Sequence, residues 1–203
     1  MKNFLLILLF LTKIITVNSQ TKDVIYSKFK DKRDNKIYKT VTIGTQTWLA
    51  ENLAYNTKIG CWAYENNQSN VEMLGYLYNW EAANKGCPLG WHLPSESEWL
   101  VLIEYLGGES IAGAKLRETG LTYWRYPNTQ ATNEFGFNAR PGGERWGNGT
   151  FEEVGIKGLW WSSTTYETVN ALFIATKYNI IETYFSTIGA KFWGLSVRCI
   201  KNK

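Results

Sequence analysis

The stretch from residue 87 to residue 108, CPLGWHLPSESEWLVLIEYLGG, constrains the fold more than any other part of the chain. Ser95 is followed three residues later by Glu98, the pattern of a capping box at a helix N-terminus. An apolar stripe with helical spacing comes next, formed by Trp99, Leu102, Ile103 and Leu106. Two glycines then stop the helix. The sequence therefore predicts an amphipathic helix that begins at Ser95, shortly after Cys87.

Residues 1–19 have the pattern of a secretory signal peptide, with a lysine before an apolar run and small residues after it. The alternative is an uncleaved anchor lying in the membrane interface. The apolar run is too short to span a bilayer, and Lys13 interrupts it. We expect residues 20–33 to be a linker and residues 34–203 to be one domain. The mature chain should be secreted or held at a bacterial cell surface, without a membrane span.

Charge argues against a nucleic-acid partner. Without residues 1–19 the chain keeps 20 basic and 18 acidic residues, a net charge of +2. No cluster of lysines and arginines stands out, so the electrostatic footprint of a nucleic-acid binder is absent from the sequence.

The chain has three cysteines, Cys61, Cys87 and Cys199. In an exported protein an odd number implies one disulfide and one free thiol, or a bond to another molecule. The alternative is that all three are reduced and buried.

Several further elements have clear signals. The alternating run IYKTVTI (residues 37–43), the turn GTQ and the run TWLAENL predict a β-hairpin. Asn79 caps a short helix that ends at Gly86. From residue 107 to residue 158 the chain is rich in glycine, and we expect loops, short strands and one short helix over residues 111–117. The last three strand-like runs, ALFIATK, IIETYFS and FWGLSVRCIK, predict an antiparallel meander.

The run YNWEAANKGCPLGWHLPSESEW resembles the progression from first helix through cysteine to second helix in C-type-lectin-like domains. In that fold the cysteine after the first helix bonds to one in the last strand. The resemblance therefore implies a Cys87–Cys199 disulfide, with Cys61 left free.

A more specific resemblance covers residues 35–200. The ordered motifs KTVTIGTQTWLAENLAY, GYLYNWEAA, CPLGWHLPSESEW, TNEFGFNARPGG, GLWWSST and GLSVRCI are similar to the Fibrobacter succinogenes major paralogous domain, a family of secreted and surface proteins. Many members have a second cysteine where this chain has Val71, which agrees with the odd cysteine count. The resemblance implies a fold and a location but no activity.

The residue types give little support for metal or catalytic chemistry. His92 is the only histidine, and no aspartate follows Asp34, so we expect no metal, no cofactor and no catalytic residue. Ser95 is already used as a cap. Formylglycine-generating enzymes have a related fold but need a reactive cysteine pair, which a Cys87–Cys199 bond removes. A glycosidase remains an alternative because the domain contains many glutamates.

Aromatic residues point to binding. Trp160 and Trp161 are adjacent, so on a strand one should face the core and the other the outside. The outward one could join aromatic residues of the glycine-rich region in a platform for sugar rings, and the candidates are Trp124, Tyr126, Trp146 and Tyr166. The alternative is that these rings pack as core beneath long loops.

The sequence thus predicts an α+β, C-type-lectin-like domain with two main helices, small antiparallel sheets and a long irregular loop region. The function we expect is a secreted or surface binding module that needs no metal, with a glycan or a cell-surface protein as partner. The alternatives are an enzyme of the formylglycine-generating or glycosidase type and a purely structural surface protein.

Overall fold

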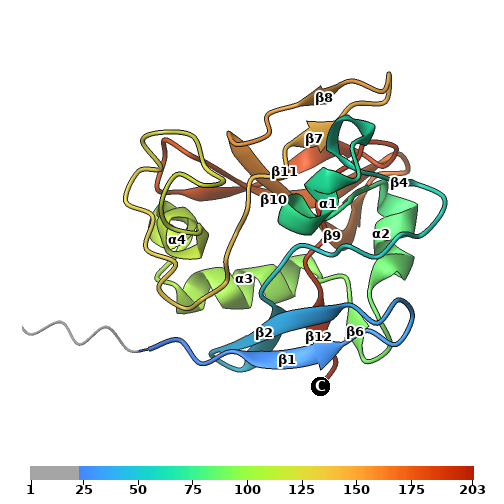
Figure 1. Cartoon of the computed structure of the whole chain (residues 1–203). Coiled ribbons are helices and arrows are strands. Elements are labelled where there is room, and N and C mark those ends of the chain that lie inside the picture. Colours follow the sequence, from blue (N-terminus) through green and yellow to red (C-terminus); the bar gives the residue numbers. More distant parts are fainter. Residues whose placement is uncertain (1–22) are drawn as a thin grey trace, which may run out of the picture.

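The computed structural model describes residues 23–203. The expected signal peptide, residues 1–19, lies outside this range. Within it, no helix has the length and apolar character needed to cross a membrane. The described chain is a mixed α+β domain, in which helices pack between and around small antiparallel sheets (Figure 1).

A five-stranded sheet contains both ends of the described chain. Its strand order is β1 (Ser27–Lys30), β2 (Ile37–Ile43), β3 (Gln46–Leu49), β12 (Ile200–Lys201) and β6 (Trp91–His92). Strands β2 and β3 are the hairpin that the alternating run predicted. The sheet curls strongly, because rings on its two edge strands meet: Phe29 and Trp91 have centroids 5.1 Å apart.

Strand β1 corrects one expectation, since it lies within the segment 20–33 that we took for a linker. Ser27–Lys30 pairs in antiparallel register with Ile37–Thr40 of β2. The sequence of β1, SKFK, is charged and short, and only Phe29 shows which face is buried. Its strand conformation depends on the neighbouring strand and not on a strong local pattern.

The second sheet has the order β11 (Thr183–Ala190), β10 (Asn170–Lys177) and β9 (Lys157–Tyr166). The antiparallel meander exists, but its third strand is β9, which precedes β10 in the chain, and not the run that ends at Lys201. The chain from Gly194 to Cys199 instead runs as buried, irregular backbone that forms single β-bridges with Tyr78, Arg145 and Trp160. Such a segment, covered on both sides, has a strand-like composition without pairing as a regular strand.

Between residues 23 and 203 there are four α-helices and a 3-10 turn. They are η1 (Tyr64–Asn66), α1 (Ser69–Leu74), α2 (Trp80–Gly86), α3 (Glu96–Tyr105) and α4 (Glu109–Leu116). The capping box of α3 is confirmed in both directions, and Asn79 caps α2 by accepting from the Ala82 amide. Helix α1 was not predicted, because its sequence SNVEML lies in a polar segment with loop-like composition.

The core consists of two clusters, and β9 lies between them. Trp161 packs with Tyr78 and Leu195 in one cluster, whereas Trp160 packs with Trp48 and Trp99 in the other. Trp160 is 1% exposed and Trp161 is fully buried. The expectation that one of them faces outward is therefore wrong, because both faces of β9 are covered.

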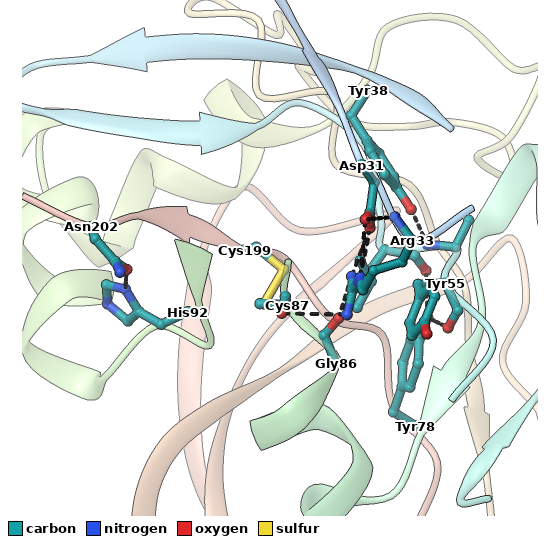
Figure 2. Close-up of a disulfide and its surroundings, with 12 residues drawn as sticks. Asp31, Arg33, Tyr38, Tyr55, Tyr78, Gly86, Cys87, His92, Cys199 and Asn202 are labelled. Atoms are coloured by element: carbon teal, nitrogen blue, oxygen red, sulfur yellow. Dashed lines mark hydrogen bonds and ion pairs between the residues drawn. A yellow bond between two sulfur atoms is a disulfide. The ribbon is translucent and has the colours of Figure 1, made fainter. Parts of the chain in front are cut away.

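The Cys87–Cys199 disulfide joins the C-terminal end of α2 to the segment that leads into β12, as the resemblance implied (Figure 2). Next to it, Arg33 donates to both carboxylate oxygens of Asp31 and to the Gly86 carbonyl 2.9 Å away. The guanidinium also stacks 3.7 Å above the ring centroid of Tyr55. These contacts attach the β1–β2 connection to the same end of α2, so the disulfide region ties three distant parts of the chain together.

Candidate functional site

The β-hairpin formed by β7 (Glu144–Arg145) and β8 (Phe151–Glu152) builds the most promising site. Trp146 and Thr150 close the turn, since the Trp146 amide donates to the Thr150 carbonyl at 2.9 Å. Gly149 has a φ of 93°, which strongly favours glycine. The hairpin is fixed to the C-terminal segment by two backbone hydrogen bonds between Arg145 and Gly194, of 2.8 and 2.9 Å.

One face of this hairpin forms a shallow hollow of about 410 Å³, which we call the hairpin hollow. It is lined by Trp146, Gly147, Asn148, Thr150, Glu152 and Phe192. Phe192 comes from the other end of the sequence and is 61% exposed, so most of its ring is in solvent. Gly147 lies directly against that ring, where any larger residue would collide with it. The hollow therefore combines an exposed aromatic ring with amide, hydroxyl and carboxylate groups.

The rings of the hollow are held in place from below. Trp146 packs edge-to-face on Trp193, with centroids 4.6 Å apart. On the opposite face of the hairpin, the Arg145 guanidinium lies 4.1 Å from the ring centroid of Trp62 and 5.7 Å from that of Phe151. These contacts pack both faces of the ribbon, so the hairpin presents Trp146 in a defined orientation.

Some polar groups of the hollow have hydrogen-bond partners within the protein, and others have none in the described chain. The Asn148 side-chain oxygen accepts from the amide and the hydroxyl of Thr150, at 3.0 and 2.8 Å. Its amide nitrogen has no acceptor among residues 23–203. The Trp146 indole N–H is buried and likewise finds no acceptor in the described chain. Of these two donors, the exposed Asn148 amide can donate a hydrogen bond to a ligand oxygen.

Glu144 and Glu152 are directly opposite each other in the β7–β8 register, so their side chains share a face of the ribbon. Glu152 lines the hollow, whereas Glu144 is 5% exposed. Burial raises the pKa of the Glu144 carboxyl; Lys157 opposes the rise, and the charges of Glu153 and Glu152 add to it. The two carboxyl groups therefore have different environments although they are neighbours.

The structure separates the six predicted ligand-binding aromatic residues. Of these, Trp146 alone lines the hairpin hollow. Trp124 is 2% exposed and donates its indole N–H to the Ala139 carbonyl at 2.9 Å, so it is a core residue like Trp160 and Trp161. Tyr126 and Tyr166 are exposed, at 76% and 45%, but neither belongs to the hollow. The alternative interpretation, core packing beneath loops, holds for three of the six.

Sequence reasoning missed Phe192, Asn148, Thr150 and Glu152. A signal for part of the set was present, since the stretch WGNGT at residues 146–150 has the composition of a tight turn that carries an aromatic and two polar side chains. Phe192 had no such signal, because it reaches the hollow only through the folded path of the C-terminal segment.

The groups considered for catalysis have structural roles. His92 lies 2.7 Å from the Asn202 side-chain oxygen and 2.9 Å from a Glu98 carboxylate oxygen, and Ser95 caps α3. Among residues 23–203 no cluster of three histidine, cysteine or acidic side chains could hold a metal ion. Cys61 is a free thiol within this range, as the resemblance implied.

The two conspicuous arginines also serve the fold. Arg140 forms an ion pair with Glu118 at 2.7 Å. Arg198 is completely buried and donates to the carbonyls of Leu49, Phe137 and Asn138. Burial lowers the pKa of Arg198 to about 9. Both residues therefore bind carbonyls or carboxylates of the protein itself.

A second concavity, of about 460 Å³, lies on the curled five-stranded sheet. Threonines 40, 42 and 47 contribute to its lining, and Lys28 and Lys201 stand at it. The Thr42 and Thr47 hydroxyls bind each other at 3.0 Å. Trp91 in this groove is only 7% exposed, whereas Phe192 in the hairpin hollow is 61% exposed. The tryptophan of the groove is therefore less accessible to a ligand than the phenylalanine of the hollow.

Fold and site together define a disulfide-linked α+β domain whose loop region carries an aromatic hollow with polar groups. The model of the Fibrobacter succinogenes major domain matches residues 41–201, and the chain belongs to this family. No curated protein and no solved structure is similar enough to match.

Proposed function

We propose that this protein is a binding module that recognises a glycan in the hairpin hollow without a metal ion. The observation that carries the proposal is the combination of the open Phe192 ring with the polar side chains of Asn148, Thr150 and Glu152 in one hollow. A sugar ring has an apolar C–H face and a rim of hydroxyl groups. An exposed aromatic ring suits the first, and amide and carboxylate groups suit the second.

Size and shape favour a sugar over a large protein partner at this position. The hollow is open and has room for one or two sugar rings, since small-molecule sites begin at about 300 Å³. A purely structural surface protein remains the simpler alternative, but it gives no reason for an aromatic ring that is 61% exposed beside available hydrogen-bond donors.

A glycosidase is the second candidate, and the carboxyl pair Glu144 and Glu152 is the observation that favours it. The different environments of these groups are typical of an acid and its partner. However, Glu152 lines the hollow and Glu144 does not, so a bound glycosidic bond would meet one carboxyl group. We therefore favour binding without hydrolysis.

Two further parts of the proposal concern fold and location. We propose a C-type-lectin-like fold, supported by the bond from the cysteine after α2 to the one before β12 and by the succession of α2, β6 and α3. We also propose export to the cell surface or the medium. The signal-peptide pattern of residues 1–19 and the disulfide support this location, because disulfides persist in oxidising compartments.

The test is a screen of the purified domain against bacterial and plant glycans in the presence of a chelator. We expect binding to at least one glycan and a loss of affinity of about tenfold or more in Phe192→Ala. Tyr126→Ala is the matched control, because it removes another exposed aromatic ring away from the hollow. Equal effects of the two substitutions, or no glycan bound at all, would contradict the proposal. Release of reducing sugar ends from the ligand would instead support the glycosidase.

A further inference from the structure

The hairpin hollow has negative charge that the protein does not neutralise. Glu144 and Glu152 share one face of the β7–β8 ribbon, and neither carboxylate has a hydrogen bond or an ion pair with residues 23–203. Glu152 reaches the hollow itself, and Glu144 lies behind it with 5% of its surface exposed. Glu152 is exposed to solvent, so its carboxylate is open to a ligand. Glu144 is the buried group, and burial without a hydrogen bond is costly for it.

Neither of the two neighbouring cations, Arg145 and Lys157, lines the hollow. Arg145 points to the opposite face of the ribbon, where its guanidinium lies between the rings of Trp62 and Phe151. Lys157 forms an ion pair of 3.3 Å with Glu153. A ligand in the hollow would therefore meet the carboxylate of Glu152 without a protein cation beside it.

Trp146 adds a second feature of the hollow, because its ring belongs to the lining. Tryptophan is also the aromatic side chain that attracts a cation most strongly. A carboxylate next to an aromatic ring is a suitable environment for an ammonium group.

We infer that the hairpin hollow recognises a glycan through a positively charged amino sugar and discriminates against acidic sugars. This inference rests on the proposed function and names its ligand class. The ammonium group of a hexosamine would face Glu152 and the Trp146 ring, and the remaining hydroxyl groups would bind Asn148 and Thr150. The carboxylate of a uronic acid in the same place would be repelled by Glu152 and by Glu144 behind it.

Calorimetric titration with four tetrasaccharides tests the inference. They are a glucosamine tetramer with protonated amines, its N-acetylated counterpart, neutral cellotetraose and tetragalacturonate. We expect the glucosamine tetramer to bind at least about tenfold more tightly than cellotetraose, and tetragalacturonate to bind most weakly. Added salt should reduce the differences in affinity among the four sugars, since it screens charges at an open site.

Glu152→Gln should remove most of the preference for the glucosamine tetramer over cellotetraose, because the amide that replaces the carboxylate carries no negative charge. Glu104→Gln is the matched control: it removes the same charge from an exposed position on α3 and should leave the order unchanged. Binding of cellotetraose without any preference for the amine would overturn the inference and leave the proposed function standing. Equal or tighter binding of tetragalacturonate would also overturn it. Failure of all four sugars to bind would contradict both.

Discussion

Removal of the Cys87–Cys199 disulfide should destabilise the domain strongly, and its effect can be estimated from the structure. The bond joins residues 112 positions apart. Cross-linking a loop of this length reduces the entropy of the unfolded chain by an amount worth about 5 kcal/mol at room temperature. The native geometry should change little when the bond is absent, because Arg33 still binds the Gly86 and Cys87 carbonyls and Cys199 stays in the core.

The assay compares Cys87→Ala/Cys199→Ala with its parent in urea, followed by tryptophan fluorescence. Both proteins should also contain Cys61→Ser, because the free thiol could otherwise form a wrong bond during refolding. We expect the free energy of unfolding to fall by about 5 kcal/mol, much of the total stability of a domain this size. A loss below about 1 kcal/mol would refute the reasoning, since the long loop would then impose no constraint on the unfolded chain.

Two further substitutions test individual contacts. Burial alone would raise the pKa of Asp31, but its hydrogen bonds and ion pair with Arg33 lower it below the ordinary value, so this pair stabilises the fold above about pH 4 and its contribution is lost as pH falls through the lowered pKa. Asp31→Asn should cost about 2 kcal/mol at neutral pH, and its urea stability should converge with that of the wild type in acid; parallel pH profiles would contradict this. Gly113→Ala should lose about 1–3 kcal/mol in thermal unfolding, although alanine favours helices, because a Cβ atom in α4 would collide with the Glu182 carbonyl. Ser110→Ala, at an exposed position of the same helix, is the control and should change stability by less than about 0.5 kcal/mol.

Local signals predicted the elements that local interactions create. The capping box of Ser95 and Glu98, the Asn79 cap and the β2–β3 hairpin are all confirmed, because each is completed within a few residues. The disulfide is also present as expected, but it came from the family resemblance and not from any local pattern.

Tertiary contacts decided what the sequence could not show. Strand β1 exists through its pairing with β2, and the segment before β12 has strand-like residues but is covered on both sides. The alternation of side chains along β9 correctly predicted that Trp160 and Trp161 lie on opposite faces of the strand. Both faces are buried, however, each in a different core cluster. The hairpin hollow depends on a contact between Gly147 and Phe192. Local sequence patterns cannot predict a contact between residues so far apart in the chain.

The position of the chain ends has a practical consequence. Strands β1 and β12 belong to one sheet, and the β7–β8 hairpin stands at the opposite end of the molecule (Figure 1). An affinity tag or a solid support joined after Lys203 would therefore leave the proposed sugar-recognising end turned towards the solution. Glycan-coated particles could be captured on such a support, and the same orientation would suit a protein displayed on a cell.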